Sequence, residues 1–265
     1  MSLVFAALTP HPPLLIPTVG KEALGKLAKT KQAMEKLEEE IYLSKAEVLV
    51  IFSPHGRLLP DAFTVGMAQE FKTDLREFGD LTTNVSFKGE LGLFSRLRQA
   101  AEAEKLKIVF ATEPALDHGV SVPLVYLTKH IPNATIVPIG FCAEGDDWKK
   151  HLDFGYLLKE QIMKSTKRVA VITSADLSHA LTTDAPAGFN PAGSEFDSKM
   201  KELLATGNAS GMLQLPPQLV HDAAQCGFRC CLMLMGMLRG VNYRYEELCY
   251  EAPFGVGYLT ANFIL

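Results

Sequence analysis

Short apolar runs alternate with amphipathic stretches along most of this chain. The run at residues 47–52 is almost entirely apolar, which is typical of a strand buried on both faces of a sheet. Similar runs at residues 62–68 and 82–87 predict additional strands with antiparallel pairing. The full set of predicted strands is residues 3–8, 47–52, 62–68, 82–87, 107–111, 134–139, 168–173, 243–250 and 257–263.

The stretches between these runs predict helices. At residues 22–42, apolar side chains recur at helical spacing among lysines and glutamates, as on a surface helix. The predicted helices are residues 22–42, 91–105, 120–130, 146–164, 195–204 and 216–238. The alternation predicts one α/β domain over residues 1–265, with a mostly parallel or mixed central sheet and helices on both faces. Residues 181–193, rich in Ala, Pro, Gly and Asp, predict a lid or substrate loop.

Composition narrows the classes of function. A net charge of −4 argues against binding to nucleic acid, which requires a basic surface. No apolar run reaches the roughly 18 residues that span a bilayer, and Pro10, Pro12 and Pro13 interrupt the N-terminal run, so neither a membrane span nor a signal peptide is expected. The five cysteines form no CxxC pair or disulfide framework, which favours the reducing cytoplasm.

Three histidines follow predicted strands. His11 lies between prolines that forbid a helix, and His55 lies in the turn Ser-Pro-His-Gly. His179 ends the segment Ser-Ala-Asp-Leu-Ser-His and is either a third ligand or a general base held by a neighbour such as Asp176 or Ser178. Because open α/β sheets bind ligands beyond the carboxyl ends of their strands, the pattern predicts a metal site there.

The remaining histidines differ in how strongly their positions in the sequence indicate a functional role. His118 directly precedes a predicted helix, where the positive helix end suits binding of an anionic oxygen. His130 and His151 lie in helical segments of mixed polarity and are predicted at the surface. His221, beside Asp222 near the start of a predicted helix, is ambiguous.

Taken in order, four motifs resemble the class III extradiol ring-cleavage dioxygenases, in their catalytic beta-subunit domain, and the related Memo-like proteins. The motifs are Pro-His11-Pro-Pro, Ser-Pro-His55-Gly, Asp-His118-Gly-Val-Ser-Val-Pro-Leu and Ser-Ala-Asp-Leu-Ser-His179. The C-terminal segment Tyr-Glu-Ala-Pro-Phe-Gly-Val-Gly-Tyr, residues 250–258, is similar to the branch linked with AMMECR1-type domains.

The resemblance implies a non-haem Fe(II) site in a single α/β domain. His11 and His55 match the two histidines that bind iron together with a glutamate in the family. His179 matches the acid/base histidine, and His118 the histidine that donates a hydrogen bond to bound substrate or oxygen. Two histidines and one carboxylate on one face of Fe(II) leave positions for a catecholate and O2.

The third metal ligand departs from the family pattern. Where the family glutamate is expected, in the predicted helix 216–238, this chain has Gln225 and Cys226. Gln225 would offer a neutral oxygen, whereas Cys226, which matches a cysteine of Memo-like proteins, would offer a thiolate and favour zinc or copper. Asp222, one helical turn before Cys226, and Glu251 are the other candidates.

The resemblance therefore implies an Fe(II)-dependent dioxygenase that inserts O2 into a catechol-like or aminophenol-like ring. A Memo-like metal-binding protein without ring cleavage is the alternative, and a metal-dependent hydrolase is a third reading of the same ligands. The expected partners are a small aromatic substrate and O2, with a homodimer and a functional link to an AMMECR1-type protein also expected.

Overall fold

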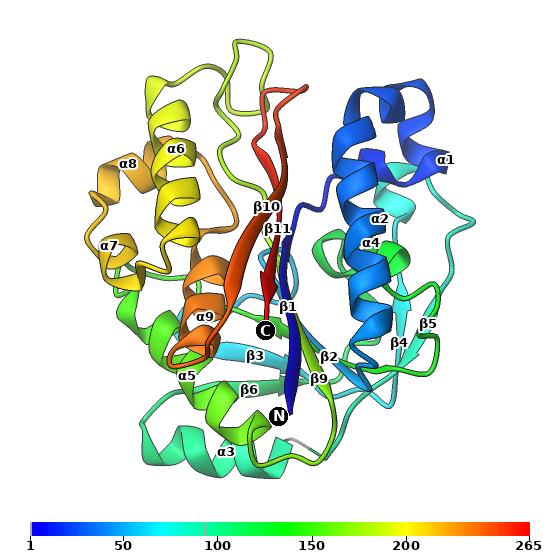
Figure 1. Ribbon diagram of the computed structural model, residues 1–265, viewed down its shortest axis with the longest axis vertical. Coiled ribbons are helices and arrows are strands. Elements are labelled where there is room, and N and C mark those ends of the chain that lie inside the picture. Colours follow the sequence, from blue (N-terminus) through cyan, green and yellow to red (C-terminus); the bar gives the residue numbers. More distant parts are fainter. Residues whose placement is uncertain (1, 93) are drawn as a thin grey trace.

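Eight strands form one mixed sheet through the middle of the protein (Figure 1). The structure is a computed structural model that describes residues 2–92 and 94–265. The strand order is β10-β11-β1-β9-β2-β8-β3-β6. The bounds are Leu3–Thr9 (β1), Val48–Ser53 (β2), Phe63–Gly66 (β3), Ile108–Ala111 (β6), Thr135–Gly140 (β8), Val169–Ser174 (β9), Arg244–Glu251 (β10) and Tyr258–Ile264 (β11).

The centre of this sheet is parallel and apolar. Strands β1, β9, β2 and β8 run in one direction, and every residue of β2 and β9 is buried, as expected where helices cover both faces. β11 pairs antiparallel with β1, and β3 pairs antiparallel with β8. The predicted α/β class with a mixed sheet is therefore confirmed.

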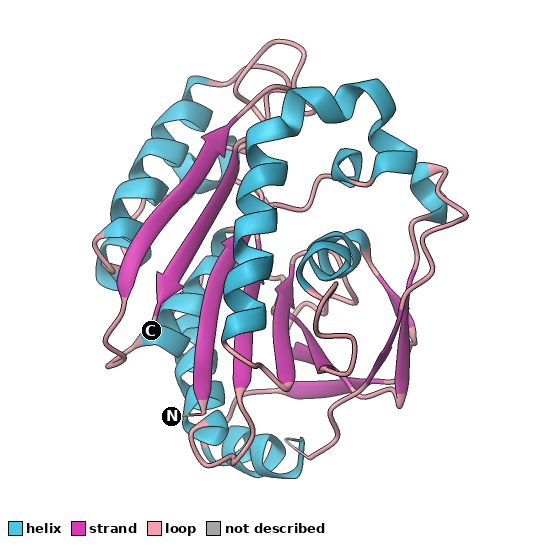
Figure 2. Ribbon diagram, turned by 45° about the vertical axis from the view of Figure 1, so that its right-hand side comes forward, coloured by secondary structure: helices cyan, strands magenta, loops and turns pink. Residues whose placement is uncertain are grey.

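Helices cover the two faces of the sheet as separate layers (Figures 1 and 2). One face carries α3 (Phe94–Ala103), α5 (Lys149–Ile162), α6 (Pro191–Ala205) and α9 (Phe228–Leu238). The other carries α2 (Ala28–Leu43) and α4 (His118–Leu127), which close over a second apolar core. The short elements are η1 (Pro13–Leu15), α1 (Pro17–Gly20), η2 (Lys21–Leu27), η3 (Arg76–Phe78), α7 (Ala209–Leu213) and α8 (Pro217–Asp222).

A second, three-stranded sheet lies beside α4 and leads into it. Its strands are β4 (Glu70–Thr73), β5 (Ser86–Lys88) and β7 (Ala115–Leu116), in the order β5-β4-β7. The sequence did not predict β4 or β7, and only residues 86 and 87 of the predicted strand 82–87 belong to β5, because these strands are short and half-exposed. β7 ends next to Asp117, so this sheet positions the start of α4.

Three predicted helices differ from the structure. The segment 216–238 is broken into α8 and α9, and Ala224 in the break has a left-handed φ of 49°. The predicted helix 22–42 begins as the 3-10 helix η2 and becomes α-helical at Ala28. Residue 93 of the predicted helix 91–105 lies outside the described residues, and of the remainder only Phe94–Ala103 is helical, as α3.

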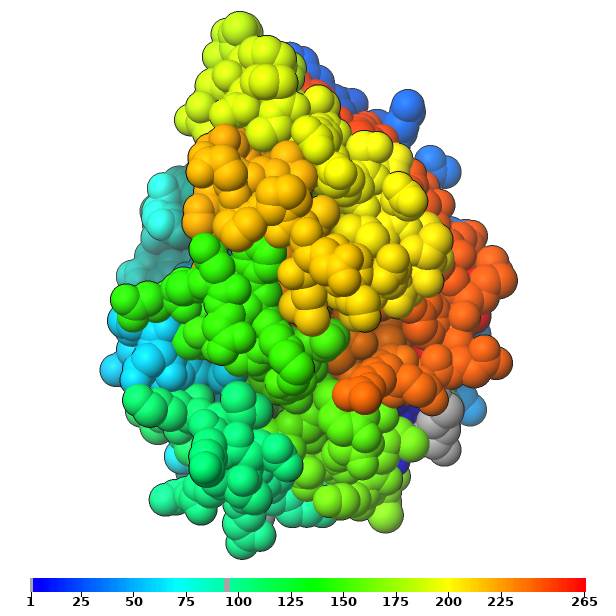
Figure 3. Space-filling view, turned by 90° about the vertical axis from the view of Figure 1, so that its left-hand side faces the viewer, coloured from blue at the N-terminus to red at the C-terminus, as the bar shows by residue number. Residues whose placement is uncertain are grey.

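The predicted loop 181–193 is shorter than expected, because Asn190 caps α6 and Pro191 begins it. The loop forms the tip at the top of Figure 3. Its backbone is tied down: Leu181 N–H donates to the carbonyl of Gly255, and Ala187 N–H donates to that of His179.

Candidate metal centre

The candidate site lies where three neighbouring strands end. β1, β9 and β2 are adjacent and parallel, so their carboxyl ends share one edge of the sheet. His11 follows β1 by two residues, His55 follows β2 by two residues, and residues 175–179 follow β9. The strand order thus brings together side chains that are far apart in the sequence.

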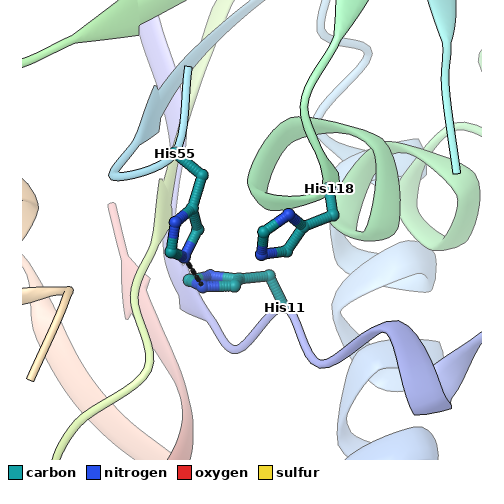
Figure 4. Close-up of side chains that lie close together, drawn as sticks. All are labelled: His11, His55 and His118. Atoms are coloured by element: carbon teal, nitrogen blue, oxygen red, sulfur yellow. Dashed lines mark hydrogen bonds between the residues drawn. The ribbon is translucent and has the colours of Figure 1, made fainter. Parts of the chain in front are cut away.

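Three imidazoles converge at this edge (Figure 4). His11 Nε2 and His55 Nε2 are 3.0 Å apart. The ring of His118 stacks on that of His55 with centroids 4.2 Å apart, and all three residues offer a nitrogen within 4.8 Å of the others. Among the described residues, these three side chains form the group whose ligand atoms all lie close enough together to hold one metal ion.

Cys226 adds a sulfur to the same place. Its Sγ is 3.5 Å from His11 Nε2 and 3.7 Å from the carbonyl oxygen of Asp176. The residue lies in the break between α8 and α9, not within a helix. Because the chain turns there through the left-handed Ala224, the thiol reaches His11.

The spacing of these donors fits one metal ion. Two nitrogens bound at about 2.1 Å lie about 3.0 Å apart when the angle at the ion is near 90°, which is narrower than tetrahedral, and a sulfur at about 2.3 Å lies about 3.6 Å from a nitrogen at the tetrahedral angle. The observed separations from His11 Nε2 are 3.0 Å to His55 and 3.5 Å to Cys226. The nitrogens of His11 and His55 and the sulfur of Cys226, which lies beside His11, are donor types that iron, zinc or copper accepts.

The lowered pKa values of His11 and His55 favour the binding of a cation. Burial, and then the neighbouring histidines, lowers the pKa of His11 well below its usual range, and the same causes lower the pKa of His55 to about 4. Both rings are neutral at pH 7, so their lone pairs are free to bind a metal. Burial raises the pKa of Cys226, so its thiol loses the proton only when a cation lies beside it.

A buried carboxylate supports this site. Asp176 Oδ1 accepts the backbone N–H of His11 at 2.9 Å, and its Oδ2 is 3.7 Å from His11 Nε2. Burial raises its pKa to about 7. From the sequence, Asp176 was predicted only as a partner of His179. In the structure it contacts His11 because β9 pairs with β1 in a register that places Ser174 beside Thr9.

Ser174 fixes the orientation of the His11 ring. Its Oγ lies 2.8 Å from His11 Nδ1, and both groups are buried. With Nδ1 carrying the proton and donating to this hydroxyl, Nε2 keeps its lone pair toward His55 and Cys226. Such outer partners hold the ring of a ligating histidine and raise its basicity. Ser174 was not among the predicted site residues, although it is the last residue of a strand that ends at the site.

His179 does not belong to the group formed by His11, His55 and His118, and its ring has a defined tautomer. Its Nδ1 lies 2.8 Å from the carbonyl oxygen of Ala224. Because a carbonyl only accepts, Nδ1 carries the proton and Nε2 is the free base. Burial lowers the pKa of His179, so the ring is neutral at pH 7 and able to take a proton through Nε2.

His118 occupies the first position of α4, as predicted. Asp117 caps the helix by accepting from Val120 N–H and also accepts the Ser53 hydroxyl at 2.6 Å. His118 Nδ1 is 3.5 Å from Glu77 Oε1. The helix end and the ring together give this position a capacity to bind an anionic oxygen.

Close packing holds His118 and His55 together through a glycine. A Cβ on Gly119 would lie 2.5 Å from Ser53 Oγ and 3.4 Å from His55 Cδ2. Only a residue without a side chain allows α4 to approach the end of β2 this closely.

The other predicted third ligands lie elsewhere. The side-chain oxygen of Gln225 accepts Phe228 N–H at 2.7 Å at the start of α9. Asp222 accepts from the Gln218 amide. Glu251 accepts both the N–H and the hydroxyl of Thr30 on α2.

Of the other histidines, His130 is exposed as predicted, with its ring 2.7 Å from Glu38. The prediction for His151 was wrong: its ring is fully buried and donates from Nε2 to the carbonyl of Cys142. It lies on the same helical stripe as Phe154 and Leu158, a spacing that points into the core. His221 is exposed and pairs with Asp146.

Residues 5–261 match the model of a protein family described as the catalytic LigB subunit of aromatic ring-opening dioxygenase. The chain belongs to this LigB family. The assignment confirms the resemblance at the level of the family. The Memo-like or AMMECR1-linked branch remains a prediction.

Two further proteins are similar to this LigB-family chain. Protein CA_C1420 from Clostridium acetobutylicum is 31% identical over 267 residues, which are 97% of this chain and 57% of that protein; the chain thus spans little more than half the length of this relative. The crystal structure of an uncharacterised protein from Escherichia coli K12, JW3007, has a TM-score of 0.63, covering 98% of this chain and 99% of its own. At 14% identity, that likeness shows the fold alone.

No helix among the described residues is long and apolar enough to cross a membrane.

Proposed function

We propose that this protein is an Fe(II)-dependent extradiol dioxygenase that inserts O2 into a catechol-like or aminophenol-like ring. One observation carries the proposal: the Nε2 atoms of two neutral histidines, His11 and His55, lie 3.0 Å apart, within electrostatic reach of His179, and His179 Nε2 is free as a base. Membership of the LigB family supports it.

Each residue of the candidate site has its own role in the proposed reaction. His11, His55 and Cys226 would hold the ion, which when bound supplies Lewis acidity and open positions for substrate and O2. His179 Nε2 takes a proton from a substrate hydroxyl and later returns it, since one histidine can serve both steps near neutral pH. His118, at the start of α4, holds an anionic substrate oxygen.

Oxygen uptake tests the proposal. Protein reconstituted anaerobically with Fe(II), at verified occupancy, is mixed with a panel of catechols and aminophenols in an oxygen electrode. We expect uptake together with a yellow ring-opened product, and a decrease of both rates by at least about 100-fold in His179→Ala with iron content unchanged. Absence of uptake with every compound in the panel would refute ring cleavage.

A Memo-like metal-binding protein without ring cleavage is the second candidate, and one observation favours it. The third donor of the group is the Cys226 thiol rather than a carboxylate, and thiolate ligands favour zinc or copper over Fe(II). Metal analysis of the protein purified without added metal, alongside Cys226→Ser, separates the candidates. Bound copper or zinc that is lost in Cys226→Ser, with no oxygen uptake after iron loading, supports the second. Cys249→Ser, a buried thiol on β10, is the matched control.

We further propose that the protein acts in the cytoplasm, forms a homodimer and works with an AMMECR1-type domain. The last proposal rests on the motif at residues 250–258 and on the greater length of the clostridial relative. Sedimentation analysis tests the dimer, and co-purification with an AMMECR1-type protein tests the partnership.

A further inference from the structure

Helix α6 buries a carboxylate next to the His179 segment. Asp197 is 2% exposed, on a helix whose other buried residues include Phe196 and Met200. Burying a carboxylate is costly unless hydrogen bonds compensate it. The hydrogen-bond partners of the Asp197 carboxylate therefore show how its burial is compensated.

Both oxygens of Asp197 have a partner. Oδ1 accepts the backbone N–H of Ser178 at 2.8 Å, and Oδ2 accepts the hydroxyl of Tyr250 at 2.7 Å. Gly257 lies against the same oxygen, because a Cβ there would be 2.0 Å from Oδ2. The carboxylate thus joins α6 to β10 and to the segment that follows β9.

The same segment is held from its other side. Gly257 N–H donates to the Ser178 carbonyl, and Leu177 N–H donates to the Gly257 carbonyl. Ser178 Oγ donates to the carbonyl of Ala223 at 2.8 Å, and that carbonyl also accepts from His179 N–H at 3.1 Å. The backbone before His179 therefore has little freedom to shift while Asp197 keeps its bond to Ser178.

We propose that Asp197 is a positioning residue that holds the His179 ring in register with the turn at Ala224, so that Nε2 points to the substrate. The inference rests on the proposed acid/base role of His179. Asp197 acts on the adjacent Ser178 backbone and does not contact the reacting atoms.

Three variants test this inference. Asp197→Ala removes both acceptors, whereas Asp197→Asn keeps an oxygen for Ser178 N–H and an amide for Tyr250. Glu195→Gln, an exposed residue on the same helix that pairs with Lys199, is the matched control. We expect Asp197→Ala to lower kcat by about 10- to 100-fold, the scale of an angstrom-sized misplacement, with KM within about threefold. Asp197→Asn should restore at least half of the activity.

A double-mutant cycle distinguishes positioning from general damage. If Asp197 acts through His179, then Asp197→Ala should change the residual rate of His179→Ala by less than about twofold. An equal loss in both backgrounds overturns the inference. If Asp197→Ala does not fold, Tyr250→Phe, which removes one hydrogen bond, takes its place with an expected loss of about two- to fivefold that also vanishes in His179→Ala.

A second measurement does not depend on ring cleavage. In zinc-loaded protein labelled with ¹⁵N-histidine, the ring N–H of His179 is assigned as the signal absent from His179→Ala. We expect this signal to shift or exchange rapidly in Asp197→Ala and to persist in Asp197→Asn and Glu195→Gln. An unchanged signal in Asp197→Ala overturns the inference. A changed signal in a protein that consumes no oxygen sustains the inference while the proposed function fails.

Discussion

Replacing Gly119 with alanine tests how tightly the site is packed. The added Cβ would lie 2.5 Å from Ser53 Oγ, 2.9 Å from Asp117 Oδ1 and 3.4 Å from His55 Cδ2. Ser53 can relieve the clash only by turning its hydroxyl away from Asp117, which breaks a bond of 2.6 Å. The substitution therefore disturbs the cap of α4 and the end of β2 together.

The expected change in the free energy of unfolding is the sum of two losses and one gain. Overpacking costs about 1–3 kcal/mol, and the lost hydrogen bond costs about 1 kcal/mol. Alanine regains about 1 kcal/mol of helix propensity at this position. We expect a net loss of about 2 kcal/mol in the free energy of unfolding, which lowers the melting temperature by about 5 °C in a protein of this size. A displaced His55 should also weaken metal binding by about 10-fold.

Differential scanning calorimetry of the metal-free protein and competition with a chromophoric chelator measure the two effects. Gly25→Ala is the matched control, because nothing lies within 4 Å of a Cβ there, and its stability should change by less than about 0.5 kcal/mol. Wild-type stability and wild-type metal affinity in Gly119→Ala would refute the argument that this approach of α4 to β2 shapes the site.

Three other substitutions probe separate parts of the protein. Ser174→Ala removes the partner of His11 Nδ1 and should weaken metal binding by about 10- to 100-fold in the chelator assay; unchanged affinity would contradict the orienting role of this hydroxyl. Gln225→Ala should cost about 1 kcal/mol in denaturant unfolding, because it removes the acceptor for Phe228 N–H, and should leave metal content unchanged; loss of metal would instead make Gln225 a ligand. Burial lowers the pKa of His151 from 6.5 to about 4, so the unfolded chain binds the extra proton first and stability falls as pH drops from about 6.5 to 4. Relative to His151→Asn, the wild type should lose about 3 kcal/mol more between pH 7 and pH 4, and parallel pH profiles of the two proteins would show that this histidine does not contribute.

Long apolar runs made the central strands predictable. β2 and β9 are buried along their whole length and therefore read as continuous hydrophobic segments. The positions of His11 and His55 beyond strand ends followed from prolines and glycine beside them. These local signals were sufficient to predict that the two residues share one edge of the sheet.

The break that carries Cys226 gave no such signal. Residues 216–238 have a composition that suits one helix, and the left-handed residue is Ala224, not glycine. A tertiary contact, the carbonyl of Ala224 accepting from His179, helps to stabilise that conformation. The contact between Asp176 and His11 also depends on the register of β9 against β1, which no local pattern specifies.

The strand order has a consequence for the timing of site assembly. His11 and Cys226 meet across a separation of 215 residues, and β1 must pair with β9 before either is in place. Contacts of such high sequence separation form slowly, because the loop between them must close first. A nascent chain would thus have no complete donor set until the segment containing Cys226 leaves the ribosome. Metal capture should consequently come last in folding, and the rate at which a refolding chain acquires metal would report the completion of its native topology.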